Sequence, residues 1–329
     1  MVKHLLPENG QFYKTNLHTH TTVSDGRLTP EEAKKRYMAQ GYQAVAFTDH
    51  DRLVPHPELC EENFLALNSV EINVRDLSRE GLPFPFRKVF HLNLFSYDQS
   101  RTEAIWGDPS LFPIEYSLEC ANRIIREAHE QGFLVSYNHP VWSQQQLVDF
   151  AGLEGVDMME VHNSECITIG YGMEGTDVYY HNMCLLGKRM VPVAGDDLHQ
   201  PAALGKGWTM IKAESLTPKA LLDALARGDA YASTGPSFHS LDFDPDTNTL
   251  SMTCSPCREV YMMSERRFAA GLNQEQNGGL VNGLQVDLSK YIRETLAYGK
   301  LENSFIRFLL VDEQGKKGYT RAYFMDEFV

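Results

Sequence analysis

Two histidines separated by a single residue are the first sign of chemistry in this chain. His18 and His20 fall in a run that predicts a strand over residues 16–21. On a strand, residues i and i+2 point to the same face, so both imidazoles can reach one metal ion. Asp25 follows in the loop Ser24-Asp25-Gly26. An isolated pair of this kind is also typical of an exposed strand, so its meaning depends on what else the chain contains.

Two further groups of acids and histidines follow apolar runs that predict strands. His50 lies in Thr48-Asp49-His50-Asp51, directly after a strand expected over 43–48. Asp197 and His199 follow a strand expected over 191–195 and again stand two residues apart. Asp196 faces the opposite way, so Asp197 is the preferred ligand, and Asp196 is either a neighbour of the ligands or a substitute ligand. Asp49 and Asp51 either orient ligand imidazoles or are solvated loop acids.

Three more candidates lie in or just after apolar runs: Glu71, His91 and His139. Glu71 stands inside a run over 65–74, and a buried carboxylate is costly unless it is paired or bound to metal. Taken singly, each of the three is also typical of a hydrogen-bonded core residue. Together the candidates are six histidines and three acids at or near the carboxyl ends of predicted strands, where α/β barrels build their sites. This shared placement predicts a polynuclear metal site formed by His18, His20, Asp25, His50, Glu71, His91, His139, Asp197 and His199.

The elements that must position these residues change character along the chain. Up to residue 234 short apolar runs alternate with helical patterns over 29–40, 117–131 and 217–227, which predicts a parallel α/β barrel or open sheet. Beyond Ser233–Pro236, alternating apolar runs over 250–254, 260–262, 305–311 and 319–324 predict a small β-sandwich, with one short helix near 288–296. We therefore expect a first domain over 1–234 and a second over 235–329.

Composition limits the classes of partner. The chain has 329 residues and a formal net charge of −14. It therefore lacks the broad basic face typical of nucleic-acid binding, so nucleic acid is an unlikely partner and a small-molecule substrate is expected. No apolar stretch approaches a membrane span, and no membrane partner is expected. The six cysteines and the N-terminal residues predict reduced thiols, no signal peptide and a cytoplasmic location.

Taken in order, these motifs resemble one family. H-x-H, S-D-G, T-D-H-D, an isolated glutamate, a strand histidine, H-P and G-x-D-x-H look like the polymerase-and-histidinol-phosphatase (PHP) family of metal-dependent phosphoesterases, over roughly residues 14–234. The resemblance implies a distorted seven-stranded β/α, TIM-like barrel with two to three divalent ions at its mouth. Mixed histidine and carboxylate ligation suits Mn²⁺, Fe²⁺ or Zn²⁺.

The resemblance also implies how the ligands divide. His18, His20, Glu71 and Asp197 would hold one ion. Glu71 would bridge to a second ion held by His91 and His139, and Asp25, His50 and His199 would hold the third. Glu71, Asp197 and His199 would thereby serve catalysis, and a metal-bound hydroxide would be the nucleophile, since the sequence offers no G-x-S-x-G elbow.

Residues around these ligands suggest substrate contacts. His162 follows a strand expected over 155–162 and is a candidate acid or substrate contact. Arg27, Arg75 and Lys206 follow site motifs and are candidate phosphate contacts, although surface charge is the better explanation of each. Aromatic residues in loops after strands could wall a pocket or pack beneath the loops: Phe84, Phe86, Trp106, Trp142 and Trp208.

The C-terminal part carries a narrower resemblance. The run Arg227–Pro236, followed by Phe305-Ile306-Arg307 and the turn Asp312–Gly315, is similar to a PHP branch that includes a carbaryl hydrolase. The favoured function is hydrolysis of a phosphoester of a small metabolite or nucleotide. The alternatives are a carboxyl or carbamate ester hydrolase of the same fold and a non-catalytic metal-binding module.

Overall fold

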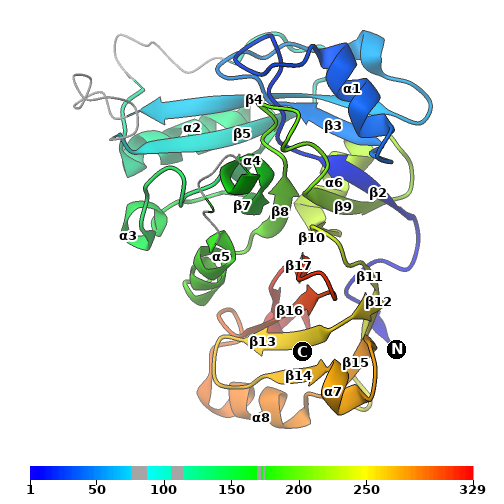
Figure 1. Cartoon of the computed structure of the whole chain (residues 1–329). Helices are drawn as coiled ribbons and strands as arrows, with labels where there is room; N and C mark the ends of the chain where they lie inside the picture. The colour runs from blue at the N-terminus through cyan, green and yellow to red at the C-terminus, as the bar shows by residue number, and fades with distance from the viewer. Residues whose placement is uncertain (76–86, 105–113, 169–171, 173–174, 329) are drawn as a thin grey trace.

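The computed structural model describes residues 1–75, 87–104, 114–168, 172 and 175–328 (Figure 1). The strands are β1 (Lys3–His4), β2 (Gln11–Asn16), β3 (Ala44–Phe47), β4 (Leu65–Arg75), β5 (Val89–Ser96), β6 (Phe133–Tyr137), β7 (Met158–Asn163), β8 (Val191–Gly195), β9 (Trp208–Ala213), β10 (Ala230–Ser233), β11 (Phe238–Asp244), β12 (Thr249–Cys257), β13 (Glu259–Ser264), β14 (Ala270–Asn273), β15 (Val281–Asp287), β16 (Phe305–Val311), β17 (Lys317–Thr320) and β18 (Tyr323–Phe324). The helices are α1 (Pro30–Met38), α2 (Leu118–Glu130), α3 (Leu147–Phe150), α4 (Ser164–Cys166), α5 (Thr176–Leu185), α6 (Pro218–Arg227), α7 (Gln274–Asn277) and α8 (Ser289–Tyr298). None of the described helices is long and apolar enough to cross a membrane.

Three helices begin where the sequence places a capping hydroxyl. The side chains of Thr29, Ser117 and Thr217 accept hydrogen bonds from the first-turn backbones of α1, α2 and α6. These bonds satisfy N–H groups that have no partner inside the helix. The apolar side of α2 packs into the same core as β4, β5 and β6, and α6 packs against β2 and β9. The helices thus cover the outside of the sheet and leave its carboxyl edge open.

The sheet that carries the candidate ligands is mixed rather than wholly parallel. Strands β2 to β8 follow one another in chain order. β2, β3 and β4 are parallel, as are β6, β7 and β8. β5 is antiparallel to both β4 and β6. The expectation that every candidate lies near the carboxyl end of a strand is therefore wrong for His91, which is near the amino end of the reversed strand β5.

The backbone at His18 and His20 also differs from the predicted strand. β2 ends at Asn16, so His18 and His20 lie just beyond the strand rather than within it. The chain after β2 meets the chain after β8: Thr19 and Leu198 form a parallel bridge. The N–H of Asp197 donates to the carbonyl of His18 at 2.9 Å, and the N–H of His20 donates to that of Leu198 at 3.2 Å. The two edges of β2–β8 thus meet at the candidate site, although the described strand pairings do not close a seven-stranded barrel.

The C-terminal strands form two layers around one core. β1, β11, β12 and β15 make a four-stranded sheet, whereas β13, β14, β16 and β17 continue the large sheet through β10. Side chains from both layers share a buried cluster that includes Phe243, Met252, Val260 and Phe308. Figure 1 shows the N-terminus beside this lower part of the molecule. Both β1 and the pairing of β10 with β17 therefore cross the expected boundary at residue 234.

Leu6 provides a test of the N-terminal strand's contribution. Its side chain is 2% exposed and packs in the C-terminal core. Leu6→Ala is expected to lower the free energy of unfolding by about 2–4 kcal/mol, because it removes buried methyl groups and leaves a cavity. Denaturant unfolding measures this loss, with the exposed Val2→Ala as the matched control. Equal stability of the two variants would show that the segment just after β1 contributes nothing to the C-terminal core.

Candidate metal centre

Glu71 lies at the centre of the candidate site. It is in the middle of β4 and its side chain is 1% exposed. Its carboxylate lies 3.0 Å from the rings of His50 and His91 and 3.2 Å from that of His18. His20 and His139 lie 3.3 and 3.4 Å away. One buried carboxylate thus contacts five of the six histidines that the sequence singles out.

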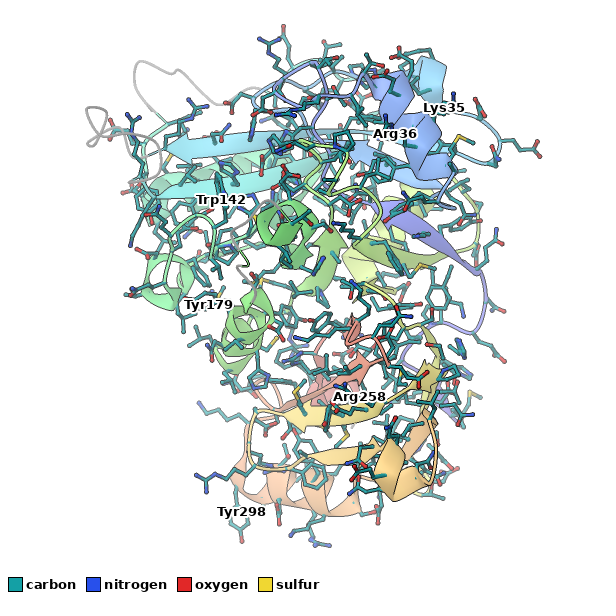
Figure 2. The ribbon with its side chains drawn as sticks, viewed as in Figure 1. Lys35, Arg36, Trp142, Tyr179, Arg258 and Tyr298 are labelled. Carbon is teal, nitrogen blue, oxygen red and sulfur yellow. The ribbon has the colours of Figure 1, made fainter. Side chains whose placement is uncertain are left out.

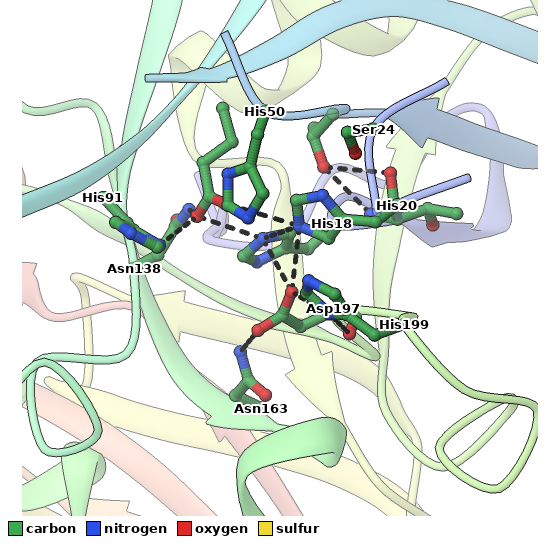
Figure 3. A network of polar contacts seen from close by, with 12 residues as sticks. His18, His20, Ser24, His50, His91, Asn138, Asn163, Asp197 and His199 are labelled. Carbon is green, nitrogen blue, oxygen red and sulfur yellow. Dashed lines mark hydrogen bonds and ion pairs between the residues drawn. The ribbon is translucent and has the colours of Figure 1, made fainter. Parts of the chain in front are cut away.

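Asp197 forms a second centre beside Glu71. Its Oδ1 lies 3.0 Å from Nε2 of His20 and 3.1 Å from Nε2 of His18 (Figure 3). The two imidazole Nε2 atoms are themselves 3.2 Å apart. The i, i+2 spacing therefore aims both rings at one point, as the sequence predicts, even though the residues lie just past the strand.

The third group lies at the more open side of the site. Asp25, with a side chain 54% exposed, has an oxygen 3.4 Å from Nε2 of His199 and another 3.7 Å from Nε2 of His50. His20 Nδ1 lies 3.7 Å from the same carboxylate. All nine predicted residues are thus brought together, and their ligand atoms form three sets with the spacing that metal ions require: His18, His20 and Asp197; Glu71, His91 and His139; and His20, Asp25, His50 and His199.

Several ligand atoms in this cluster are buried without a hydrogen bond in the described part of the chain. They are His20 Nδ1, Glu71 Oε2, Asp197 Oδ1 and both ring nitrogens of His91. Leaving one buried polar atom unpaired costs about 1–3 kcal/mol. Glu71 Oε2 lies 3.3 Å from His20 Nε2, and His91 Nδ1 lies 3.0 Å from Glu71 Oε1. Such a donor set fits divalent cations.

Residues that the sequence analysis did not select hold these ligands in place. Glu160 on β7 has one oxygen 3.0 Å from His18 Nδ1, which directs Nε2 of that ring toward the cluster. Its other oxygen accepts from the backbone N–H of His139 at 3.1 Å and from Asn163 at 3.0 Å. Glu160 is an acid inside an apolar run, the signal that singled out Glu71, so the sequence contained the means to find it.

Two buried asparagines orient the central carboxylates. Asn138 donates to Glu71 Oε1 at 2.9 Å, and Asn163 donates to Asp197 Oδ2 at 3.0 Å (Figure 3). The backbones of Asp197 and His139 have φ of 51° and 22°, in the left-handed region that non-glycine residues rarely adopt. Such strain persists where the surrounding contacts over-determine the conformation, and it clusters at functional sites.

Asp196 has a different role from its neighbour Asp197. It is fully buried and accepts hydrogen bonds from the backbone N–H groups of Gly205, Lys206 and Gly207 at 2.6, 3.1 and 3.0 Å. Ser164 Oγ donates to it at 2.8 Å. Burial raises the pKa of Asp196, against the effect of these donors. Asp196 therefore fixes the loop after β8 and faces away from the ligand cluster.

The acids beside His50 act on the backbone rather than on imidazoles. Asp49 accepts from the backbone of Thr21 at 2.8 Å and from Ser24 Oγ at 2.8 Å, so it shapes the loop that carries Asp25. Asp51 accepts from the Asn73 amide at 2.9 Å, and that amide nitrogen lies 3.2 Å from His50 Nδ1. The hypothesis that Asp49 orients a ligand imidazole is thus wrong, and Asp51 reaches His50 only through Asn73.

A cavity of about 540 Å³ opens over the cluster. It is lined by seven of the nine candidates, by the aromatic side chain of Trp142, and by the cations Arg75, Arg87 and Lys88. Arg75 pairs with Asp51 at 3.3 Å, and Lys88 pairs with Asp149 at 2.7 Å. Of the three predicted phosphate contacts, only Arg75 lines this cavity, and Arg27 is exposed.

The remaining predicted contacts lie elsewhere. His162 and Lys206 line a second cavity of about 590 Å³ next to the first. Trp142 lines both cavities, whereas Trp208 packs under Lys14, whose Nζ lies 4.1 Å from the ring centre. Phe84, Phe86 and Trp106 lie outside the described residues.

Burial and neighbouring charges shift the pKa values of the titratable groups in the first cavity in different directions. Burial lowers the pKa of His91 to about 4, so this ring is neutral at pH 7, as a metal ligand must be. His199 is buried too, but the carboxylates of Asp197 and Asp25 outweigh burial and raise its pKa to about 10. Burial, with the charge of Asp197, raises the pKa of Glu165 to about 7. Glu165 lines the cavity and was not identified from the sequence.

Comparison with known proteins supports the family resemblance. The sequence model of the PHP domain matches residues 16–104, which is less than half of the chain. A relative, the 5′-3′ exoribonuclease Rnm of Salmonella typhimurium, is 43% identical over 58 residues. That match covers 17% of this chain and 20% of the relative, so the chain spans about a fifth of the length of this relative.

Solved structures show the same fold over a longer span. A two-domain protein from Bacteroides vulgatus, described as containing a predicted PHP-like metal-dependent phosphoesterase, is 15% identical with a TM-score of 0.50, covering 98% of each chain. The lesion-specific endonuclease PfuEndoQ from Pyrococcus furiosus is 14% identical with a TM-score of 0.41, covering 65% of this chain and 56% of its own. The first likeness shows that the fold of this chain, over nearly its whole length, resembles that of another protein.

Substitution of Asp196 and of Asp197 should have different effects, because Asp196 fixes a loop and Asp197 is a candidate metal ligand. Asp196→Asn is expected to lower the free energy of unfolding by about 1–3 kcal/mol, because an amide nitrogen cannot accept the loop N–H bonds. Asp197→Asn, measured in parallel, should alter metal content with a smaller effect on the stability of chelator-treated protein. Thermal unfolding and elemental analysis of both variants check this assignment. An Asp196→Asn protein of unchanged stability that no longer retains metal would place Asp196 among the ligands.

Proposed function

We propose that this chain is a metal-dependent phosphoesterase whose nine clustered residues hold two to three divalent ions. The single observation that carries the proposal is the set of buried ligand atoms, without hydrogen bonds, that converge around Glu71 and Asp197. The PHP domain match over residues 16–104 supports it. We further propose the finer division of the fold, with a distorted β/α barrel over 1–234 and a β-sandwich over 235–329.

The three sets of ligand atoms support the proposed division of the ions. His18, His20, Glu71 and Asp197 would hold one, His91 and His139 with Glu71 the second, and Asp25, His50 and His199 the third. Bound divalent ions supply Lewis acidity: they withdraw charge from a phosphoryl oxygen and activate water for attack at phosphorus. Mn²⁺, Fe²⁺ and Zn²⁺ all suit this mixture of imidazole and carboxylate.

The chain's own residues supply orientation and charge. Glu160 fixes the ring of His18, and Asn163 fixes the carboxylate of Asp197, so the ligand atoms are already aimed before an ion enters. Arg75, Arg87 and Lys88 place cationic groups along the cavity wall, where they can bind the oxygens of a phosphoester. Trp142 supplies an apolar wall for the organic part of the substrate.

Metal content tests the first part of the proposal. Protein purified without chelator is expected to contain two to three equivalents of transition metal by elemental analysis. His18→Ala and Asp197→Ala should each lose most of the metal and most of the turnover, because each opens the shared cluster. His129→Ala is the matched control, since this half-exposed histidine pairs with Asp157 on the outer side of the sheet. Less than one equivalent in the parent protein would contradict a polynuclear site.

Charge separates phosphoester from carboxyl-ester or carbamate hydrolysis. Three divalent ions would outweigh the carboxylates of Asp25, Glu71 and Asp197, and the wall cations add to the positive field. A phosphomonoester dianion needs such a field, whereas a neutral carbamate needs only an apolar wall and fewer ions. The geometry therefore favours the phosphoester over the ester alternative.

Paired substrates test this preference. We expect kcat/KM for an aryl phosphate to exceed that for the matching aryl ester, and inorganic phosphate to inhibit competitively. His50→Ala, which weakens the most open of the three ligand sets, should reduce phosphoester turnover more than ester turnover. Steady-state kinetics with both substrates and both proteins give the answer. A preference for the ester without inhibition by phosphate would favour the carbaryl-hydrolase-like alternative.

A second candidate function is cleavage of phosphodiester bonds in nucleic acid. It is favoured by the 43% identity over 58 residues to a protein named as a 5′-3′ exoribonuclease. The expectation that nucleic acid is an unlikely partner rests on net charge alone and is weakened by this relative. Including a 5′-phosphorylated oligoribonucleotide in the substrate panel distinguishes this candidate from a phosphatase of small metabolites.

A further inference from the structure

The second cavity lies directly beside the metal-ligand cluster. Its lining shares His139, Trp142 and Cys166 with the first cavity. Asn163, which donates to the ligand Asp197, also lines it. In Figure 2 Trp142 lies in the upper part of the molecule, above Tyr179. A molecule with one end at the cluster can therefore extend past Trp142 into this second space.

Two parts of the chain that are far apart in sequence build this cavity. Strand β7, helix α4 and the loop after β8 supply His162, Ser164 and Lys206, and the turn after β16 together with the first residue of β17 supplies Gln314–Lys317. Asp312 holds that turn by accepting from the N–H groups of Gln314 and Lys316, both at 2.8 Å. Thr234 and Lys317 exchange backbone and side-chain hydrogen bonds at 2.9 Å. These hydrogen bonds fix the turn between β16 and β17 in the wall of the second cavity.

The charge of this cavity is opposite to that of the whole chain. Lys206, Lys316 and Lys317 line it together with one acid, Asp177, although the net charge of the protein is −14. Lys206 Nζ donates to Thr168 Oγ1 at 3.1 Å. Within the described part of the chain, Lys316 and Lys317 form hydrogen bonds through their backbones and no ion pair through their ammonium groups, so both ammonium groups are available to an anion.

His162 adds a neutral polar group to the cavity wall. Burial, together with the charges of Lys316 and Lys317, lowers the pKa of His162 to about 4. The ring is therefore uncharged at pH 7, and its Nε2 lies 3.2 Å from Ser164 Oγ. Gly207 packs against the ring: a Cβ there would be 2.6 Å from His162 Cδ2, so the glycine makes room for this histidine.

We propose that the second cavity binds a phosphate group of the substrate other than the one hydrolysed, through the ammonium groups of Lys206, Lys316 and Lys317. This inference rests on the proposed phosphoesterase function and narrows its substrate class to molecules with at least two phosphates. A bisphosphorylated metabolite and a short nucleic-acid strand share this chemistry. The C-terminal part would then determine specificity without taking part in bond breaking.

The experiment compares two substrates that differ only in the second anion. One is an aryl phosphate; the other is the same aryl phosphate with a non-hydrolysable phosphonate on a flexible tether. In the parent protein the phosphonate is expected to raise kcat/KM by about tenfold or more, since charge-assisted bonds to phosphate-like oxygens are strong. Lys316→Gln/Lys317→Gln should remove this advantage while kcat/KM for the plain aryl phosphate stays within about twofold. Added salt should reduce the advantage in the parent protein.

The matched control is Lys290→Gln/Lys300→Gln, which removes two exposed lysines in and just after α8 and should keep the advantage. The proposal is overturned if the two substrates have equal kcat/KM in the parent protein, or if the double variant at 316 and 317 keeps the advantage. If neither substrate is hydrolysed, the proposed function fails, but the second cavity can still be tested by calorimetric binding of an alkyl phosphonate to the full chain. Binding that is weakened in the double variant at 316 and 317 supports the proposed phosphate site. No binding overturns the proposed site. A 5′-phosphorylated dinucleotide compared with the mononucleotide shows which source of second phosphate is preferred.

Discussion

The structure depends on a carboxylate that cannot be buried alone. Glu71 is almost fully buried in β4, and an isolated carboxylate in such a place costs several kcal/mol. Five imidazoles surround it, yet the described contacts leave one of its oxygens and several ring nitrogens without hydrogen bonds. Against the effect of burial, the carboxylates raise the pKa of His18 and His50, whereas burial lowers the pKa of His91 to about 4, so the ring of His91 takes up no proton at pH 7. Divalent cations would satisfy both the charge and the unpaired atoms, and the surrounding strands hold the donors ready for them.

The strands can hold these donors because the two ends of the β2–β8 series meet at the same place. The chain beyond β2 and the chain beyond β8 bond to each other through Thr19 and Leu198, so His18, His20 and Asp197 form one rigid unit. On the other side, the reversed strand β5 brings His91 to Glu71 from its amino end. Glu160 then ties β7 to both halves through His18 and the backbone of His139. Ligand geometry therefore depends on strand pairing, which places Glu71 and His91, and on the hydrogen-bonded segments just beyond the strands, which place the other ligands.

Much of this site could be predicted from the sequence because i, i+2 spacing and acids in apolar runs are local signals. Helix starts at Thr29, Ser117 and Thr217 were predictable for the same reason. The reversed direction of β5 was not, because nothing local distinguishes a strand that returns beside its predecessor from one that crosses over. Nor was the pairing of β1 with β11, which joins residues 238 positions apart at His4 and Asp242. The contribution of Lys316 and Lys317 to a cavity depends on the same kind of long-range pairing, since a pair of lysines in a turn is typical of solvated surface.

Net charge alone is a weak guide to partners for a physical reason. A formal charge of −14 describes the whole chain, whereas a ligand responds to the potential within about one Debye length, roughly 10 Å. Here the cavity over the cluster is bordered by Arg75, Arg87 and Lys88, and its neighbour by three lysines. Bound divalent ions would add to that field and reverse the sign that the ligand carboxylates give the site. An acidic protein can therefore receive a polyanion, provided that its cations are gathered where the phosphates must lie.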